Sequence, residues 1–170
     1  MGKFIRYKKL FAVFAVLTLF WMGVIFMFSA QNAEKSTSES HGVTDKIISH
    51  TDPEYKELDE HEQNVRMSQL NDKVRKLAHA FNFVVLGILV GAASLTFCTK
   101  PYRNVCFAFV LCAAYAASDE LHQRFVPGRG ASIRDVGIDC LGALIGTALV
   151  ISAFYAIKAL RGMRKVKKLR

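Results

Sequence analysis

Several common functional signatures are missing from this sequence of 170 residues. It contains no glycine-rich phosphate loop, no internal repeat and no low-complexity tract. Ser118 and Ser132 do not stand in a motif that would activate a serine nucleophile. The sequence therefore does not indicate phosphate-loop or serine chemistry, and it leaves open whether the protein is an enzyme.

Cysteine pairs typical of metal sites are also missing. None of the four cysteines has CxxC spacing, and all lie in or beside apolar runs: Cys98, Cys106, Cys112 and Cys140. We interpret them as small packing residues. The sequence predicts no cofactor and no metal ion. A metal site remains an alternative, because His79, His122 and two carboxylates offer suitable donor atoms.

Acidic residues are absent from three basic segments. Four basic residues lie in residues 1–9, two in the link 100–103 and seven in the tail 158–170, whereas all 14 acidic residues lie elsewhere. Lys and Arg favour the cytoplasmic side of a membrane. We therefore expect both termini and the link to be cytoplasmic. The tail directly follows an apolar run, so it is interpreted as setting topology and touching anionic lipid, not as binding nucleic acid.

The sequence does contain long uncharged, mostly apolar runs, at residues 10–33, 77–99, 104–118 and 140–157. A run of about 18 or more such residues is typical of a transmembrane helix, and three of the four pass that test. We predict one domain over residues 1–170, an all-α four-helix bundle in a membrane. Its spans are expected at about 10–30, 77–99, 103–123 and 136–158, with an outer loop at 31–76 and a basic cytoplasmic tail at 159–170.

The first run is preceded by basic residues, as in a secretory signal peptide. It is longer than a usual signal core, however, and SAQNAEK offers no good pair of small residues for cleavage. We expect a retained anchor. In the outer loop, Ser36 and Glu39 have capping-box spacing. An apolar face at Met67, Leu70 and Val74 predicts an amphipathic helix that runs into the second span, in a helical hairpin on the outer membrane surface.

Polar residues follow the third run, which is too short to cross a bilayer. Fifteen residues of helix extend about 22 Å, less than the hydrocarbon thickness of about 30 Å. A full crossing therefore carries Asp119, Glu120, His122 and Gln123 into the outer leaflet, unless the bilayer thins locally. Charged groups at that depth normally face the interior of a bundle. We expect these four side chains to point inward.

Two other helices supply partners for them. Asp135, Asp139, Gly142 and Gly146 share one face of the fourth span, where the GxxxG spacing permits close helix packing and self-association. On the second span, His79 lies on one face with Asp72, Arg75 and Asn82. All of these faces meet at the outer end of the bundle. The sequence thus predicts one polar pocket, lined by His79, Asp119, Glu120, His122, Gln123, Arg129, Asp135 and Asp139.

Four stretches carry a family resemblance. They are Phe28-Ser-Ala-Gln31, Arg75-Lys-Leu-Ala-His79, Asp119-Glu-Leu-His-Gln123 with Pro127-Gly-Arg129, and Asp135 with Asp139-Cys-Leu-Gly142. Together they resemble the VanZ-like family, from about residue 28 to 146. Family members often carry an acidic residue and a tyrosine where Asn82 and Phe83 stand here. The resemblance implies a small four-helix protein of the bacterial cytoplasmic membrane, in a family whose founding member is associated with teicoplanin resistance.

Four functions remain possible for the pocket. It binds an amphiphile of the outer leaflet, such as a membrane lipid or a lipid-linked cell-wall precursor, through bidentate arginine contacts. It acts as an enzyme on such a headgroup, with Glu120, His79 or Asp139 as acid or base. It holds a metal ion. As the fourth alternative, the pocket has a structural role only, in which its charged side chains pair with one another and hold the helices of the bundle together. An ion pathway is disfavoured, because no ionisable residue continues through 80–99 or 142–157.

Overall fold

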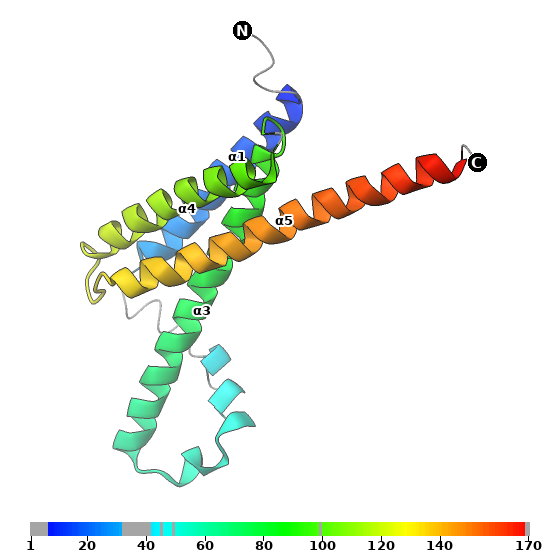
Figure 1. The fold of residues 1–170 in the computed structure, drawn as a ribbon. Coiled ribbons are helices and arrows are strands. Elements are labelled where there is room, and N and C mark those ends of the chain that lie inside the picture. Colours follow the sequence, from blue (N-terminus) through cyan, green and yellow to red (C-terminus); the bar gives the residue numbers. More distant parts are fainter. Residues whose placement is uncertain (1–6, 32–41, 45, 49, 99, 169–170) are drawn as a thin grey trace.

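The structure is a computed structural model that describes residues 7–31, 42–44, 46–48, 50–98 and 100–168 (Figure 1). The described part is helical and contains no strand. Its long helices are α1 (Lys8–Ser29), α3 (Glu60–Ser94), α4 (Pro101–Gln123) and α5 (Ile133–Lys168), and a short 3-10 helix η1 spans Pro53–Glu57. All four long helices are long and apolar enough to cross a membrane, which confirms the all-α class and suits a multi-pass membrane protein.

Successive long helices run in alternating directions. Ser29 at the end of α1 contacts Asp119 near the end of α4, and His79 of α3 contacts both Asp119 and Asp139, near the start of α5. The end of α1, the middle of α3, the end of α4 and the start of α5 therefore meet in one place. We call this place the polar end of the bundle. It is the end at which the sequence predicted that polar residues would gather.

Glycines bring α3 and α5 into close contact. A Cβ atom built on Gly146 would lie 2.0 Å from the carbonyl oxygen of Val84, and one on Gly142 would lie 2.5 Å from that of Ala80. Gly87 of α3 approaches the backbone of Ala143 in the same way. Small residues allow such backbone contact between membrane helices. The GxxxG glycines thus pack against α3 of the same chain, and self-association through them stays a prediction.

Two aromatic side chains connect α1 to the rest of the bundle. The indole of Trp21 donates a hydrogen bond of 3.0 Å to the carbonyl oxygen of Asn82 in α3. The hydroxyl of Tyr115 in α4 donates one of 2.6 Å to the carbonyl oxygen of Met22. A buried core with Ile25 and Phe83 lies between these contacts. Each ring combines apolar packing with a polar group that needs a partner when buried, so both fix the position of α1.

Helix α3 continues beyond the polar end of the bundle. Its 35 residues correspond to about 52 Å, more than the hydrocarbon thickness of about 30 Å. This confirms the prediction that an amphipathic helix runs directly into the second span. Figure 1 shows the first half of α3 extending away from the other helices, beside the helical residues 42–44, 46–48 and 50–51. The expected capping box at Ser36 and Glu39 lies outside the described residues.

The segment before α3 is attached to this extension by polar contacts. The buried hydroxyl of Thr44 donates to Oδ1 of Asn71, which is also buried, over 3.1 Å. Arg66 forms an ion pair with Asp52. Ile48 is buried as well. Residues 42–44, 46–48 and 50–52 therefore have a defined position against α3, but their location relative to a membrane surface stays a prediction.

Asp59 caps the N-terminus of α3, and replacing it tests how firmly that extension is formed. Its carboxylate accepts the backbone N–H of Glu62 over 2.7 Å. Asp59→Ala is expected to cost about 1 kcal/mol, because the first-turn amides lose their acceptor. Amide hydrogen exchange should accelerate in residues 60–64 and remain unchanged in α1. Equal exchange in both proteins would show that this cap does not hold the first turn.

Candidate ligand-binding site

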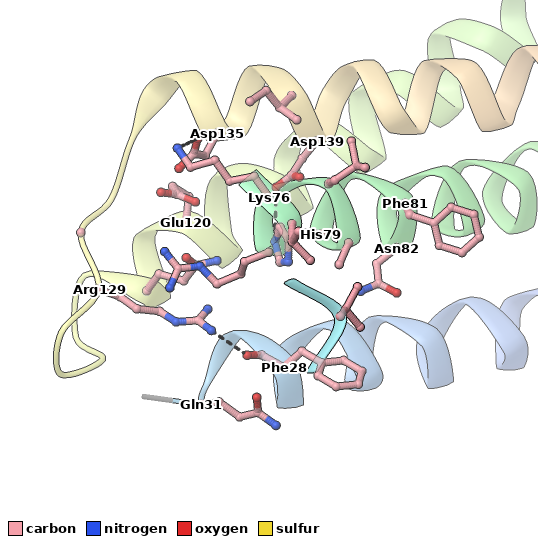
Figure 2. A pocket seen from close by; sticks show the side chains of 18 of the residues that line it. Phe28, Gln31, Lys76, His79, Phe81, Asn82, Glu120, Arg129, Asp135 and Asp139 are labelled. Atoms are coloured by element: carbon pink, nitrogen blue, oxygen red, sulfur yellow. Dashed lines mark hydrogen bonds and ion pairs between the residues drawn. The ribbon is translucent and has the colours of Figure 1, made fainter. Parts of the chain in front are cut away.

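A cavity of about 740 Å³ opens at the polar end of the bundle (Figure 2). Its walls come from α1, α3, α5, the end of α4, the loop 124–132 and the segment before α3. The apolar wall includes Phe28, Val43, Ile47, Leu77 and Phe81. The charged wall consists of Arg75, Lys76, His79, Glu120, Arg129, Asp135 and Asp139. An amphiphile could place its headgroup and its chain on different walls of this cavity.

Asp119 is the centre of a buried hydrogen-bond network behind the cavity. Its Oδ2 accepts from the hydroxyl of Ser29 at 2.7 Å and from Nε2 of Gln123 at 3.1 Å, and it lies 3.0 Å from Nε2 of His79. Its side chain is 1% exposed. Three helices are thus joined at one oxygen atom. Such a network fixes the relative position of α1, α3 and α4.

His79 lies between two carboxylates. Its Nε2 is 3.0 Å from Oδ2 of Asp119 and 3.3 Å from Oδ2 of Asp139. An imidazole nitrogen carries at most one hydrogen, and the contact with Asp119 is the shorter and has hydrogen-bond geometry. Oδ2 of Asp139 is buried and accepts no hydrogen bond within the described part of the chain. The cavity therefore has a carboxylate oxygen in its lining that still requires a donor.

The other two carboxylates of the cavity have partners. Oε1 of Glu120 accepts the backbone N–H of Ser132 over 2.5 Å, and the Ser132 hydroxyl accepts the N–H of Arg134 at the start of α5. Asp135 forms an ion pair of 2.8 Å with Lys76. These contacts connect α4 to α5 and α5 to α3. Glu120, however, faces no cationic side chain within ion-pair distance in the described residues.

Arg129 is the basic residue of the cavity that forms no ion pair with a carboxylate of the described residues. The turn at Pro127-Gly128 places it there, and Gly128 adopts a φ of 76°, which favours glycine. Its guanidinium donates to the carbonyl oxygen of Phe28 at 3.3 Å, and its buried Nε has no hydrogen-bond partner in the part of the chain that the structure describes. Burial and the nearby Arg75 lower the pKa of Arg129 from its ordinary value. A half-buried guanidinium without an anion is suited to bind one.

Six of the eight predicted pocket residues line the cavity: His79, Glu120, Gln123, Arg129, Asp135 and Asp139. Asp119 lies behind the lining and supports it through His79 and Gln123. His122 does not join this group. Its ring packs on that of Phe26, with 4.5 Å between the ring centroids. Since His122 follows Glu120 by two residues, which is about 200° around the helix, it points to another side of α4 than Glu120.

Sequence reasoning did not assign several residues that the structure adds. Ser29 and Gln31 come from the end of α1, and Lys76 comes from α3, one residue after Arg75. Val43 and Ile47 reach the cavity from the segment before α3. Two signals were available for Ser29, its position at the end of an apolar run and its place in the family stretch Phe28-Ser-Ala-Gln31, but neither named its partner. Its contact with Asp119 joins residues 90 positions apart, so no local pattern could reveal it.

The alternative metal site requires His79 and His122 to approach each other. Among the described residues, no group of three or more His, Cys, Asp or Glu side chains is arranged to hold a metal ion. The described cysteines are all free thiols, and Cys112 packs in the core as expected.

Comparison with known proteins identifies the family. The VanZ/LLP1 family model matches residues 14–155, which extends from α1 into α5 and includes every residue of the charged wall. No curated protein and no solved structure matches the chain. The matched region includes all four sequence stretches that resemble the VanZ-like family. In the structure, the helix with the GxxxG spacing packs on α3, and His79 lies beside Asp119 and Asp139. The chain belongs to the VanZ/LLP1 family.

Proposed function

We propose that this protein binds an amphiphile of the bacterial cell envelope, a membrane lipid or a lipid-linked precursor, in the cavity at the polar end of the bundle. The observation that carries the proposal is the lining of the cavity, with an apolar wall at Phe28, Leu77 and Phe81 and an unpaired guanidinium at Arg129. The anionic part of the headgroup binds Arg129, and the hydrocarbon chain lies along the apolar wall.

Exposed apolar side chains at the cavity support entry of the amphiphile from the surrounding lipid. Leu77 and Phe81 line the cavity and are 75% and 65% exposed, on the side of α3 that faces away from the bundle core. Side chains this apolar are stable at that exposure when lipid covers them. An amphiphile in the same leaflet could enter between them without leaving the membrane.

Orientation in the membrane is part of the proposal. The basic segments at 1–9, 100–103 and 158–170 support an orientation with the polar end on the outer side. A reporter fused after Thr51 should then score as external. A cytoplasmic score would place the cavity in the inner leaflet and exclude cell-wall precursors that have already crossed the membrane.

Arg129 is the residue whose replacement tests the proposal most directly. Arg129→Gln is expected to reduce the amount of copurifying amphiphile about tenfold, because the charge-assisted contact contributes about 1.5–3 kcal/mol. Arg124→Gln is the matched control, since Arg124 is exposed in the same loop and does not line the cavity. Mass spectrometry of the intact purified protein measures both. Identical bound amphiphile in the wild type and both variants would refute the proposal.

A link to glycopeptide resistance is a further part of this proposal, and the family relationship motivates it. If the bound amphiphile takes part in the action of teicoplanin, cells that express Arg129→Gln should become as susceptible as cells without the protein. Cells that express Arg124→Gln should match the wild type. If deletion of the gene does not change susceptibility, this chain has no role in resistance. Amphiphile binding would then still be tested by the mass spectrometry of Arg129→Gln.

A further inference from the structure

The charges of the cavity are unevenly distributed between its two sides. Lys76 is paired with Asp135, and Arg75 is paired with Asp72 outside the cavity over 3.1 Å. Among the described residues, this leaves Arg129 as the cation without an anion. On the other side, no lysine or arginine of the described ranges forms an ion pair with Asp139 or Glu120, and the nearest basic group is the imidazole of His79.

The acidic side contains more carboxylates than one imidazole can neutralise. Asp119, Glu120 and Asp139 all act electrostatically on one another or on His79. Even when His79 carries a proton, the three carboxylates have one imidazolium beside them and the more distant guanidinium of Arg129, which acts electrostatically on Asp119 and Glu120. Asp119 takes the hydrogen of Nε2, so the nearest oxygen of Asp139 has no donor. A buried carboxylate oxygen without a donor is stabilised by a ligand that supplies an N–H or O–H group, and most strongly by a positively charged N–H group.

Asp139 is placed to contact such a ligand. It lines the cavity, is 2% exposed as a whole residue, and projects from the first turns of α5 toward His79 (Figure 2). Arg129 reaches the same cavity from the loop on the side of α1. Within the described part of the chain, the cavity therefore presents to a single bound molecule one guanidinium without an anion, that of Arg129, and two carboxylates without a lysine or arginine partner, those of Asp139 and Glu120.

From this arrangement we infer that the ligand headgroup is zwitterionic and carries a primary ammonium group as well as a phosphate or carboxylate. The inference rests on the proposed function and specifies its ligand class. The anionic group binds the guanidinium of Arg129, and the ammonium N–H groups bind Asp139 and the neighbouring Glu120. A quaternary ammonium is excluded from this role because it has no N–H donor. A purely anionic headgroup would face three carboxylates without compensation.

The test compares three defined lipids on the full chain. The purified protein is exchanged into nanodiscs that contain equal amounts of phosphatidylethanolamine, phosphatidylglycerol and phosphatidylcholine. Lipids that remain bound after release into detergent are counted by native mass spectrometry. The wild type is expected to retain phosphatidylethanolamine about tenfold over each of the other two, the ratio that one charge-assisted contact gives. Equal retention of phosphatidylglycerol or phosphatidylcholine would overturn the inference.

Variants assign the preference to a residue. Asp139→Asn should bring the ratio of phosphatidylethanolamine to phosphatidylglycerol close to one, whereas Glu57→Gln, an exposed change outside the cavity, should leave it unchanged. An unchanged ratio in a folded Asp139→Asn protein would contradict the role of this carboxylate. Asp139 is buried, so its replacement could disturb folding, and circular dichroism checks that the Asp139→Asn protein is folded. The comparison of the three lipids on the wild type tests the inference independently of this variant.

The outcomes also separate this inference from the proposed function. If the wild type holds phosphatidylethanolamine and phosphatidylglycerol equally and Arg129→Gln releases both, amphiphile binding stands and the zwitterionic preference is wrong. If no lipid remains on the wild type above the amount found on Arg129→Gln, both proposals fail.

Discussion

Replacing Gly146 by alanine is expected to destabilise the protein strongly. A Cβ at this position would lie 2.0 Å from the carbonyl oxygen of Val84 and 3.1 Å from the amide nitrogen of Ile88, both backbone atoms that cannot move aside. The helices α3 and α5 must then separate, and their close packing is lost. Overpacking of this kind costs about 1–3 kcal/mol or more. The midpoint of unfolding in detergent should fall, together with the amount of protein in the membrane.

Gly137 supplies the matched control on the same helix. Nothing lies within 4 Å of a Cβ built there. Gly137→Ala should therefore leave the unfolding midpoint unchanged or raise it slightly, because alanine favours helix over glycine by about 1 kcal/mol. If Gly146→Ala were as stable as Gly137→Ala, the close contact of α5 with α3 would be wrong.

Removing the carboxylate of Asp119 has the second large expected effect. Asp119→Ala would leave Ser29, His79 and Gln123 without their shared acceptor in the bundle interior. A buried polar group that is left unsatisfied costs about 1–3 kcal/mol, and the remaining contacts of His79 with Asp139 and of Gln123 with Ser29 are longer, at 3.3 and 3.4 Å. The three losses are not additive, and we expect a decrease of about 3–5 kcal/mol in the free energy of unfolding. Thermal unfolding of the detergent-solubilised protein measures it.

Ser29→Ala is the comparison for this prediction, because it removes one donor and leaves the acceptor with two others. It should cost about 1 kcal/mol. Equal stability of the two variants would show that Asp119 is not the centre of the network. The same experiment separates structure from binding: Arg129→Gln should keep the stability of the wild type, since its one hydrogen bond is a 3.3 Å contact to a backbone oxygen.

These two effects also explain why the polar residues of the family motifs have different roles. Asp119 is buried behind the cavity and joins three helices, so the reading in which charges lock the bundle fits it. Arg129 and Asp139 line the cavity and retain unused hydrogen-bonding capacity, so binding fits them. One sequence series, Asp119-Glu-Leu-His-Gln123, thus contributes to both structure and site. A count of charged residues alone could not separate the two roles.

The helices themselves follow from local patterns in the sequence. Long apolar runs identify α1, α3, α4 and α5, and the amphipathic face at Met67, Leu70 and Val74 correctly predicts that α3 begins well before its apolar part. Their ends are less well predicted, since a helix continues through charged residues as long as backbone hydrogen bonds continue. Helix α5 accordingly runs through the basic tail to Lys168.

The helical period of the sequence also predicted which residues of the candidate site share a helix face. Asp135 and Asp139 share a helical face, as do Arg75 and His79, and both faces do line the cavity. The same reasoning misplaced His122 because it grouped residues 119–123 by sequence proximity. A helix turns by about 100° per residue, so neighbours in sequence face different directions. His122 consequently packs on Phe26 and not beside His79.

The sequence by itself determined the all-α class, the four helices that are long and apolar enough to cross a membrane, and the end of the bundle where polar groups gather, because hydrophobicity and helical period act within a few turns. Only the tertiary structure decided which polar atoms remain without partners. Contacts such as Ser29 with Asp119, Lys76 with Asp135 and Arg129 with Phe28 connect residues 59 to 101 positions apart. Whether Asp139 has a donor depends on these long-range contacts together, because the hydrogen on Nε2 of His79 that Asp119 accepts is not available to Asp139.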